Sequence, residues 1–280
     1  MPEYAALLPR VRWGDHEITR LVIGHNPMKG CSHVSKALDD EMREWYDPAA
    51  GRDLEALRLA ERHGINTAQF GGDVMHSRLA RHRAGGGGLQ WIATFYEGKE
   101  PEAELEAILN VDPAPIGIQY YGERVDTNFI EGRVDHTRDM VKRLRDTGLL
   151  VGVCSHLPQT IEQVESEGWD VDFYQTCFYT VYSKVAEGRI DRGDERYDND
   201  DRERMASLVG RVSKPCIAFK VLGASRNCAT PADVEAAFRF AYDRIKPTDV
   251  VAVGMWQKYR DQVGENASMV RRILAGTSTA

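Results

Sequence analysis

The sequence predicts a (β/α)8 barrel preceded by a β-hairpin, because short apolar runs of strand length alternate with stretches of helical periodicity. The last unit begins with the run 250–253, breaks at Gly254 and continues as an amphipathic helix from about Asp261. An apolar run, a glycine and a helix form one β/α unit. Seven earlier runs have the same character, so the chain holds eight units, the number that closes such a barrel. The alternative is a doubly wound open sheet, which usually has fewer strands and would not need all eight.

The elements follow in order along the chain. Strands are expected at 21–26, 65–70, 89–95, 116–121, 149–156, 171–177, 216–221 and 250–253. Helices are expected at 37–46, 53–64, 136–148, 159–168, 231–245 and from about 261. Gly14 and Asp15 lie between two short alternating runs within 9–19, which predicts a hairpin that caps the bottom of the barrel.

Three of the connections that follow a strand are long. They are the first, from Asn26 to about Arg52, the fourth, 122–135, and the sixth, 179–205. Active sites of this fold are built from such connections at the carboxyl ends of the strands. The sixth is the longest irregular stretch, and it is either a solvated surface loop or a lid over the barrel mouth.

The composition predicts one cytoplasmic domain that spans residues 1–280 and binds a small molecule. The length is close to the ~250 residues typical of this barrel, and 42% of the residues are hydrophobic, enough for a large core. A formal charge of −7 argues against a nucleic-acid surface. Five scattered cysteines predict no disulfide framework and a reducing compartment. No run approaches the ~18 apolar residues of a membrane span, so we expect no membrane partner, and a homo-oligomer stays open.

Alternation along each strand predicts which side chains point into the barrel. In the fifth strand the small Gly152 and Cys154 are expected inside, which places His156 at the mouth. In the seventh strand the small Ala218 is expected inside, which brings Lys220 inward and turns residues 217, 219 and 221 towards the helices. The predicted mouth consists of Asn26, Gln119, Tyr121, His156, Gln175, Cys177, Lys220 and Trp256, with the second strand ambiguous between Gln69 and Phe70.

Each chemical candidate also has a structural interpretation. Lys220 lies among apolar neighbours, and burial lowers the pKa of a lysine, but a salt bridge to Glu123 would make it structural. His156 could simply be hydrogen-bonded at a strand end, and cysteines such as Cys177 commonly fill cores. The tripeptide CSH occurs at 31–33 and again at 154–156, and zinc takes Cys and His ligands. No tight CxxC or HExxH spacing accompanies it, so we predict no metal.

Several segments carry a resemblance to the aldo/keto reductase superfamily over nearly the whole chain. Strand two and the residues before it, AERHGINTAQF, resemble the family's "GINFFDTA", and FYQ in strand six resembles its "VNQ". The segment VGVCSHLPQTIEQV is similar to "IGVSNFSPEQLEEA" in the fifth unit. The segments CIAFKVLGASR and VVAVGMWQKYRDQVGEN resemble "GVIAMKPLGAGR" and "VVIGMRSPEQVDEN" in the last two units. The carboxyl-terminal half is the more specific match and resembles a divergent, uncharacterised bacterial branch.

The resemblance implies a nicotinamide dinucleotide, NADP or NAD, bound by the carboxyl-terminal half. Ser155 and His156 fall where the family holds the carboxamide, and Gln175 falls near the nicotinamide. Further cofactor-binding residues implied in the same way are Arg226, Lys258 and Arg260 around the phosphates and Gln262, Glu265 and Asn266 around the adenine. Phosphate groups need cationic partners and a helix start, which this stretch offers.

The family's catalytic tetrad of Asp, Tyr, Lys and His is absent from the matching positions. Gln69 stands at the Asp position, ATFYEG ends strand three without a Lys, and tyrosines stand where His is expected. Reduction of a carbonyl needs a proton donor near the oxygen. We therefore expect Tyr121 or His156 as the acid, with Lys220 lowering its pKa. The residues expected to contact the substrate are Asn26, Gln69, Gln119, Cys177 and Trp256.

Three functions follow from these residues. The first is NAD(P)-dependent reduction of a small carbonyl or sugar-like compound, implied by the retained residues of the last unit. The second is a lyase or isomerase in which His156 and Lys220 move a proton next to a carbonyl, with or without a metal. The third is a catalytically silent barrel that binds a ligand.

Overall fold

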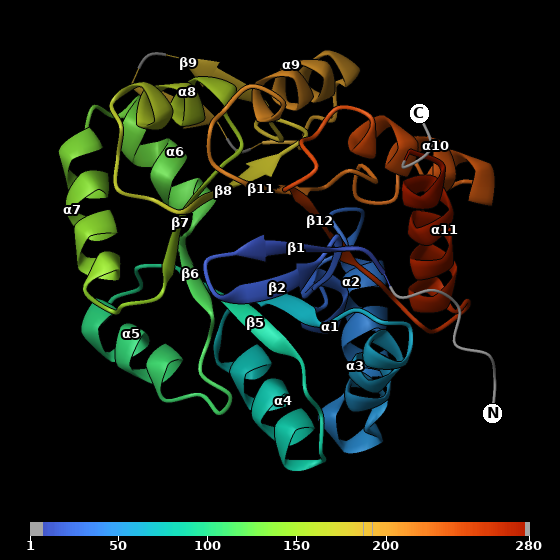
Figure 1. Cartoon of the computed structure of the whole chain (residues 1–280). Coiled ribbons are helices and arrows are strands. Elements are labelled where there is room, and N and C mark those ends of the chain that lie inside the picture. Colours follow the sequence, from blue (N-terminus) through green and yellow to red (C-terminus); the bar gives the residue numbers. More distant parts are fainter. Residues whose placement is uncertain (1–7, 187, 192, 278–280) are drawn as a thin grey trace.

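The computed structural model describes residues 8–186, 188–191 and 193–277 and shows a closed barrel of eight parallel strands. Figure 1 looks along the barrel, with the helices ringed around the strands. The barrel strands are β3 (Leu21–Gly24), β4 (Thr67–Phe70), β5 (Gln90–Phe95), β6 (Gly117–Tyr120), β7 (Leu150–Ser155), β8 (Phe173–Cys177), β11 (Cys216–Phe219) and β12 (Val250–Gly254). Pairing of β12 with β3 closes the ring, which confirms the predicted (β/α)8 barrel.

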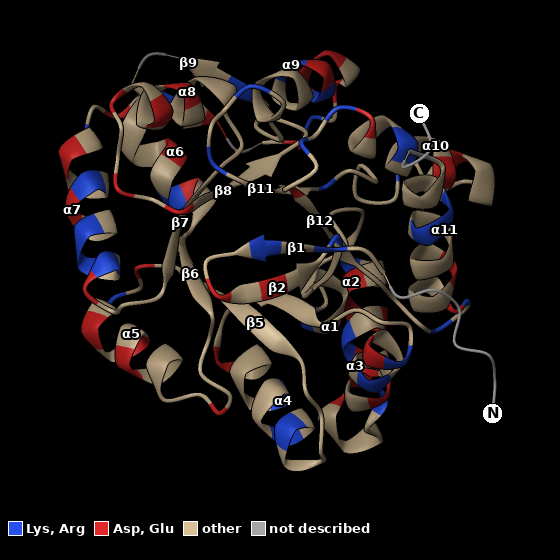
Figure 2. Cartoon of the chain, in the orientation of Figure 1, with Lys and Arg blue, Asp and Glu red and all other residues tan. Residues whose placement is uncertain are grey.

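Charged residues occur along the helices and loops, whereas the eight barrel strands carry none (Figure 2). The helices are α1 (Asn26–Lys29), α2 (Lys36–Trp45), α3 (Arg52–Arg62), α4 (Asp73–Ala84), α5 (Pro101–Leu109), α6 (Gly122–Ile130), α7 (Val134–Arg145), α8 (Pro158–Ser166), α9 (Asn199–Val209), α10 (Pro231–Tyr242) and α11 (Gln262–Thr277), with a 3-10 turn at Pro48–Ala50. Helix α10 shows how the sequence starts a helix: Thr230 and Asp233 form a capping box around Pro231 in the first turn.

A hairpin closes the bottom of the barrel, as predicted. Strands β1 (Arg10–Trp13) and β2 (His16–Thr19) pair across the turn at Gly14 and Asp15. Trp13 is stacked on Phe173 with ring centroids 5.4 Å apart, and its indole nitrogen donates to the Thr248 carbonyl at 2.9 Å. The hairpin thus supplies a large aromatic ring to the lower barrel core.

The inward phase of β11 differs from the prediction. Ile217 belongs to the inner cluster with Trp13 and Phe173, whereas Ala218 packs in the outer core under the helices. The expectation that small residues face inward holds at Gly152, because a Cβ there would lie 2.3 Å from the Phe173 ring. It fails at Ala218, because in β11 the large Ile217 packs with Trp13 and Phe173 in the barrel interior.

The long connections contain more regular structure than the sequence indicated. The fourth holds helix α6, and the sixth holds the hairpin of β9 (Lys184–Ala186) and β10 (Arg189–Asp191) and the first turns of α9. Within the described residues, no helix combines the length and apolar character that a bilayer crossing requires.

Candidate active site

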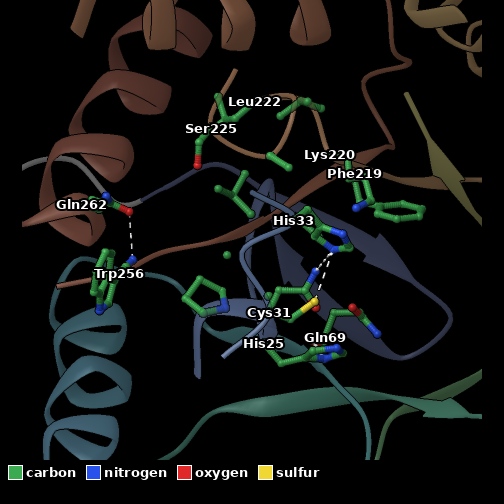
Figure 3. Close-up of a pocket in the computed structure, with 18 of the residues that line it drawn as sticks. His25, Cys31, His33, Gln69, Phe219, Lys220, Leu222, Ser225, Trp256 and Gln262 are labelled. Atoms are coloured by element: carbon green, nitrogen blue, oxygen red, sulfur yellow. Dashed lines mark hydrogen bonds between the residues drawn. The ribbon is translucent and has the colours of Figure 1, made fainter. Parts of the chain in front are cut away.

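The carboxyl ends of the strands open into a cavity of 1120 Å³, part of which is drawn in Figure 3. Its floor is the barrel mouth, and its walls come from the first connection, the sixth connection and the loop after β11. The cavity continues without interruption to the first turns of α11, where Gln262 and Asn266 line it. The cavity therefore has room for more than a small substrate.

Three glutamines form the floor. Gln69, Gln119 and Gln175 end alternate barrel strands and are at most 6% exposed. The amide nitrogens of Gln69 and Gln119 both donate to the Thr94 hydroxyl, at 2.7 and 3.1 Å. The side-chain oxygens of Gln119 and Gln175 have no hydrogen-bond partner among the described residues. Buried acceptors without partners are costly, so the floor is built to receive donors from a ligand.

His156 enters the cavity from the end of β7 and is held by a buried carboxylate. Asp126, on α6, is fully buried and accepts from the His156 ring Nδ1 at 2.9 Å and from the His156 backbone N–H at 3.0 Å. Tyr182, from the sixth connection, donates to the same carboxylate at 2.7 Å, and Ser155 also donates to it. Because Nδ1 carries the proton in this arrangement, Nε2 is the basic nitrogen.

A lysine–tyrosine pair lies on the other side of the mouth. Lys29, at the end of α1, donates to the Tyr96 hydroxyl oxygen at 3.1 Å, and the Tyr96 ring packs 4.8 Å from that of Tyr121. Burial lowers the pKa of Lys29, while burial with the neighbouring Glu104 and Cys31 raises the pKa of Tyr96. The Tyr96 hydroxyl is therefore protonated at neutral pH and in contact with a cation.

Lys220 reaches the cavity, but not by strand alternation. Strand β11 ends at Phe219, which faces the mouth and meets the His156 ring edge-on at 5.6 Å. Lys220 follows with a φ of 56°, in the left-handed region, which redirects its side chain into the same cavity. Its ammonium contacts the Tyr197 hydroxyl at 3.4 Å. The prediction that Lys220 lies in the barrel mouth is thus correct. Strand alternation, the predicted reason, and Tyr121 and His156, the predicted partners, are not what the structure shows.

The far end of the cavity is shaped by the loop after β11 and the start of α11. Gly223, Ala224 and Ser225 have φ values of 60°, 47° and 79°, a run of left-handed residues that includes two non-glycines. Such backbone strain concentrates at ligand sites. Gln262 accepts from the Trp256 backbone N–H at 2.8 Å, and Arg260 pairs with Glu265 at 3.0 Å.

Most of the residues expected from the sequence line this cavity. They are Asn26, Gln69, Gln119, Tyr121, His156, Gln175, Lys220, Trp256, Arg260, Gln262, Glu265 and Asn266. In the second strand it is Gln69, and not Phe70, that faces the mouth.

Four expected residues lie elsewhere. Ser155 and Cys177 are fully buried behind the wall, Ser155 against Asp126. Arg226 covers the Tyr197 ring at 3.7 Å, and Lys258 pairs with Glu41 at 2.5 Å. The direction of a side chain at a strand end or in a loop depends on tertiary partners that a residue-by-residue resemblance does not contain.

The sequence reasoning missed several residues of the site. Lys29, Tyr96, Phe219 and Glu195 line the cavity, and Asp126 supports it from behind. Lys29 lies in the first long connection, which was a signal that could have been followed. Among the described residues, no group of three or more His, Cys, Asp or Glu side chains is arranged so that it could hold a metal ion.

No protein-family model and no curated protein sequence matches this chain. Its fold is similar to that of a Pseudomonas aeruginosa protein assigned to the aldo-keto reductases, at 14% identity, with a TM-score of 0.61 and coverage of 98% of this chain and 99% of that one. A thermostable aldo-keto reductase solved with the inhibitor epalrestat gives a TM-score of 0.55 at 13% identity, covering 95% and 94% of the two chains. A Schiff-base-forming fructose-1,6-bisphosphate aldolase gives 0.53 at 13% identity, covering 90% and 93%. At these identities the likeness concerns the barrel fold.

Proposed function

We propose that this protein is an oxidoreductase that binds NADP or NAD and transfers a hydride to or from a small carbonyl compound. The observation that carries the proposal is the continuity of the cavity from the barrel mouth to the start of α11. Its 1120 Å³ exceed the volume of ordinary small-molecule pockets, which is ~300–1,000 Å³. An extended two-part ligand suits this shape, with its reactive ring at the mouth.

The mouth fits a nicotinamide. The partnerless oxygens of Gln119 and Gln175 can accept from the carboxamide NH2, which supplies the donors that the floor lacks. Phe219, half-buried at the mouth, offers an apolar ring against which a planar ring can stack. When bound, the dinucleotide supplies the hydride, and the residues of this chain orient its ring and the substrate.

The far end fits the rest of a dinucleotide. Helix α11 has 16 residues and presents its N-terminal turn to the cavity, where the positive end of the helix dipole favours anions. Ser225 and Asn266 add polar groups on either side. Arg226 and Lys258, implied by the resemblance, are engaged with Tyr197 and Glu41. The phosphates would therefore rely on the dipole of α11 and on Arg260, which would have to exchange its pairing with Glu265 for a phosphate oxygen.

Tyr96 is the proton donor in this proposal. Because Lys29 donates to the Tyr96 oxygen, the phenolic hydrogen is left to point at a carbonyl oxygen in the mouth. When that proton moves to the substrate, the Lys29 ammonium stabilises the tyrosinate that forms. Tyr121 packs against Tyr96 and donates to Glu123 at 2.7 Å, which makes it a positioning residue in place of the acid expected from the sequence.

A second candidate function rests on the His156–Asp126 pair. A histidine whose Nδ1 is held by a buried carboxylate is the usual arrangement of a general base. With Lys220 nearby in the cavity, this base would move a proton next to a substrate carbonyl in a lyase or isomerase reaction that uses no dinucleotide.

Titration of the purified protein with NADPH and with NADH separates these functions. Trp256 lines the cavity, so energy transfer from tryptophan to the reduced nicotinamide should appear on binding. Trp256→Phe should weaken the transfer, whereas Trp169→Phe, a control packed on Phe129 outside the cavity, should weaken it less.

The outcomes are distinct. Saturable transfer, together with oxidation of the bound nucleotide by a carbonyl compound, supports the oxidoreductase. The absence of saturable binding for both nucleotides overturns it. Exchange of substrate C–H for solvent deuterium without a nucleotide, lost in His156→Gln, supports the second function. Binding of a ligand without either reaction identifies a silent barrel.

A further inference from the structure

A cysteine, a histidine and a glutamate form a hydrogen-bonded relay in the cavity wall, in which Nε2 of the histidine, His33, also lies 3.1 Å from the side-chain nitrogen of Asn26. The Cys31 Sγ lies 3.6 Å from Nε2 of His33, and Nδ1 of His33 lies 2.8 Å from Oε1 of Glu195. Cys31 and His33 lie in the first connection, and Glu195 comes from the sixth, 162 residues from His33. All three side chains line the cavity, and Figure 3 shows the contact between Cys31 and His33.

The loop that carries the thiol is rigidly held. Its Ser32 hydroxyl donates to Asp39 at 2.6 Å, and the Arg226 guanidinium donates to the His33 carbonyl at 3.2 Å. His33 itself has a φ of 58°, a left-handed conformation that is uncommon for histidine. Strain of this kind persists where the surroundings enforce it and is frequent at functional sites.

The residues around Cys31 and His33 also favour a thiolate. Tyr197 donates to the other oxygen of Glu195 at 2.6 Å, which fixes that carboxylate. The hydrogen bond to His33 lowers the pKa of Cys31 although burial opposes it, and the nearby Lys220 acts in the same direction. At His33 burial acts to lower the pKa, but hydrogen bonds to Cys31 and Glu195 raise it. Hydrogen bonds from His33 and Tyr197 outweigh burial and lower the pKa of Glu195 to about 2.

Another thiol in the same cavity lacks this environment. Cys228 is similarly half-buried and also lines the cavity, but burial raises its pKa to about 11. A cysteine that merely fills space would resemble Cys228. The contrast within one cavity indicates that the environment of Cys31 is specific.

We propose that Cys31, His33 and Glu195 form a nucleophilic centre in which the Cys31 sulfur adds to the carbonyl carbon of small aldehydes. His33 takes the thiol proton, and Glu195 orients the imidazole and stabilises its charge. The sulfur lone pair then forms a C–S bond as the C=O π bond breaks. The oxygen recovers the proton from His33, which gives a neutral thiohemiacetal and needs no oxidant or reductant.

This proposal does not depend on nicotinamide binding, because it is tested on the full chain without any dinucleotide. The first experiment measures alkylation of each cysteine by iodoacetamide at pH 7, read by mass spectrometry of peptides. Thiolate nucleophilicity falls with pKa, which offsets part of the gain in thiolate fraction, so Cys31 should react at least about tenfold faster than Cys228. Equal rates would overturn the proposal.

Two variants test the relay. Glu195→Gln keeps the shape but removes the charge, and it should slow the alkylation of Cys31 by about threefold or more while leaving Cys228 unchanged. The matched control, Glu41→Gln, removes a carboxylate that pairs with Lys258 outside the relay and should leave both rates unchanged. If Glu195→Gln folds and Cys31 reacts as fast as in the parent protein, the relay is refuted.

The aldehyde is tested with propionaldehyde as the probe. Reversible adduct formation should protect Cys31 from iodoacetamide, leave Cys228 unprotected and disappear on dilution. Cys31→Ser should abolish the adduct. Undiminished alkylation of Cys31 would overturn the assignment to sulfur. So would an imine on Lys29 or Lys220 that borohydride reduction traps in place of the sulfur adduct.

Discussion

The carboxylate of Asp126 should be among the most sensitive polar groups in the structure to substitution. It is fully buried and joins three parts of the chain: α6, the end of β7 at His156, and the sixth connection through Tyr182. Asp126→Ala removes the acceptor from the His156 backbone N–H, the His156 ring and the Tyr182 hydroxyl. Each buried donor left without a partner costs about 1–3 kcal/mol. The sum is at least about 3 kcal/mol, a large part of the ~5–15 kcal/mol of a typical domain.

The assay is urea unfolding followed by far-ultraviolet circular dichroism, with the free energy of unfolding extrapolated to water. The control is Asp135→Ala, because the Asp135 side chain is 91% exposed and pairs with Arg138 on the surface. Exposed pairs contribute below about 1 kcal/mol. If the two variants lose the same free energy of unfolding to within about 0.5 kcal/mol, the network does not stabilise the fold, and the reasoning is refuted.

Four further outcomes are expected. Tyr96→Phe should lower kcat for carbonyl reduction by ~10²–10⁴-fold, whereas Tyr259→Phe, at an exposed position outside the cavity, should not. Lys220→Met should spare folding, and under the second candidate function, in which Lys220 acts beside His156, it should abolish turnover. Lys220→Gly should raise the free energy of unfolding by about 1 kcal/mol, because a φ of 56° suits glycine. Deletion of the β9–β10 hairpin should weaken ligand affinity while changing the free energy of unfolding little. An affinity equal to that of the parent protein would show that this segment is dispensable for binding. Because the pKa of Cys31 is lowered, its thiolate should persist to lower pH than that of a free thiol, so alkylation of Cys31 should decline at lower pH.

The barrel was predictable because its signals are local. Each strand is a short apolar run, each helix has one apolar face, and glycines such as Gly254 separate them, so the order of elements follows from short windows of sequence. The alternation of side chains along β4, β6 and β8 then correctly placed Gln119 and Gln175, and Gln69 as one of two alternatives, at the mouth, although Cys177, predicted on the same face as Gln175, does not line the cavity. These positions depend only on the strand period, which is the same in every sheet.

The phase of β11 was not predictable in this way. Gly152 is inside because the ring of Phe173, on another strand, fills its space, whereas Ile217 is inside and packs with Trp13 and Phe173. Lys220 reaches the mouth through a left-handed turn after the strand. Interior volume is shared among strands distant in sequence, so a rule applied to one strand cannot determine it.

The composition and periodicity of this sequence by themselves determined the eight units, the capping hairpin and the polar character of the mouth. Tertiary structure decided which side chains act together. Asp126 meets Tyr182, 56 residues away, and His33 meets Glu195, 162 residues away. These pairs are made by three long connections, the first, the fourth and the sixth, at the same mouth. Their hydrogen bonds depend on distances of a few ångströms between segments that share no local pattern, and only the closed barrel brings those segments together.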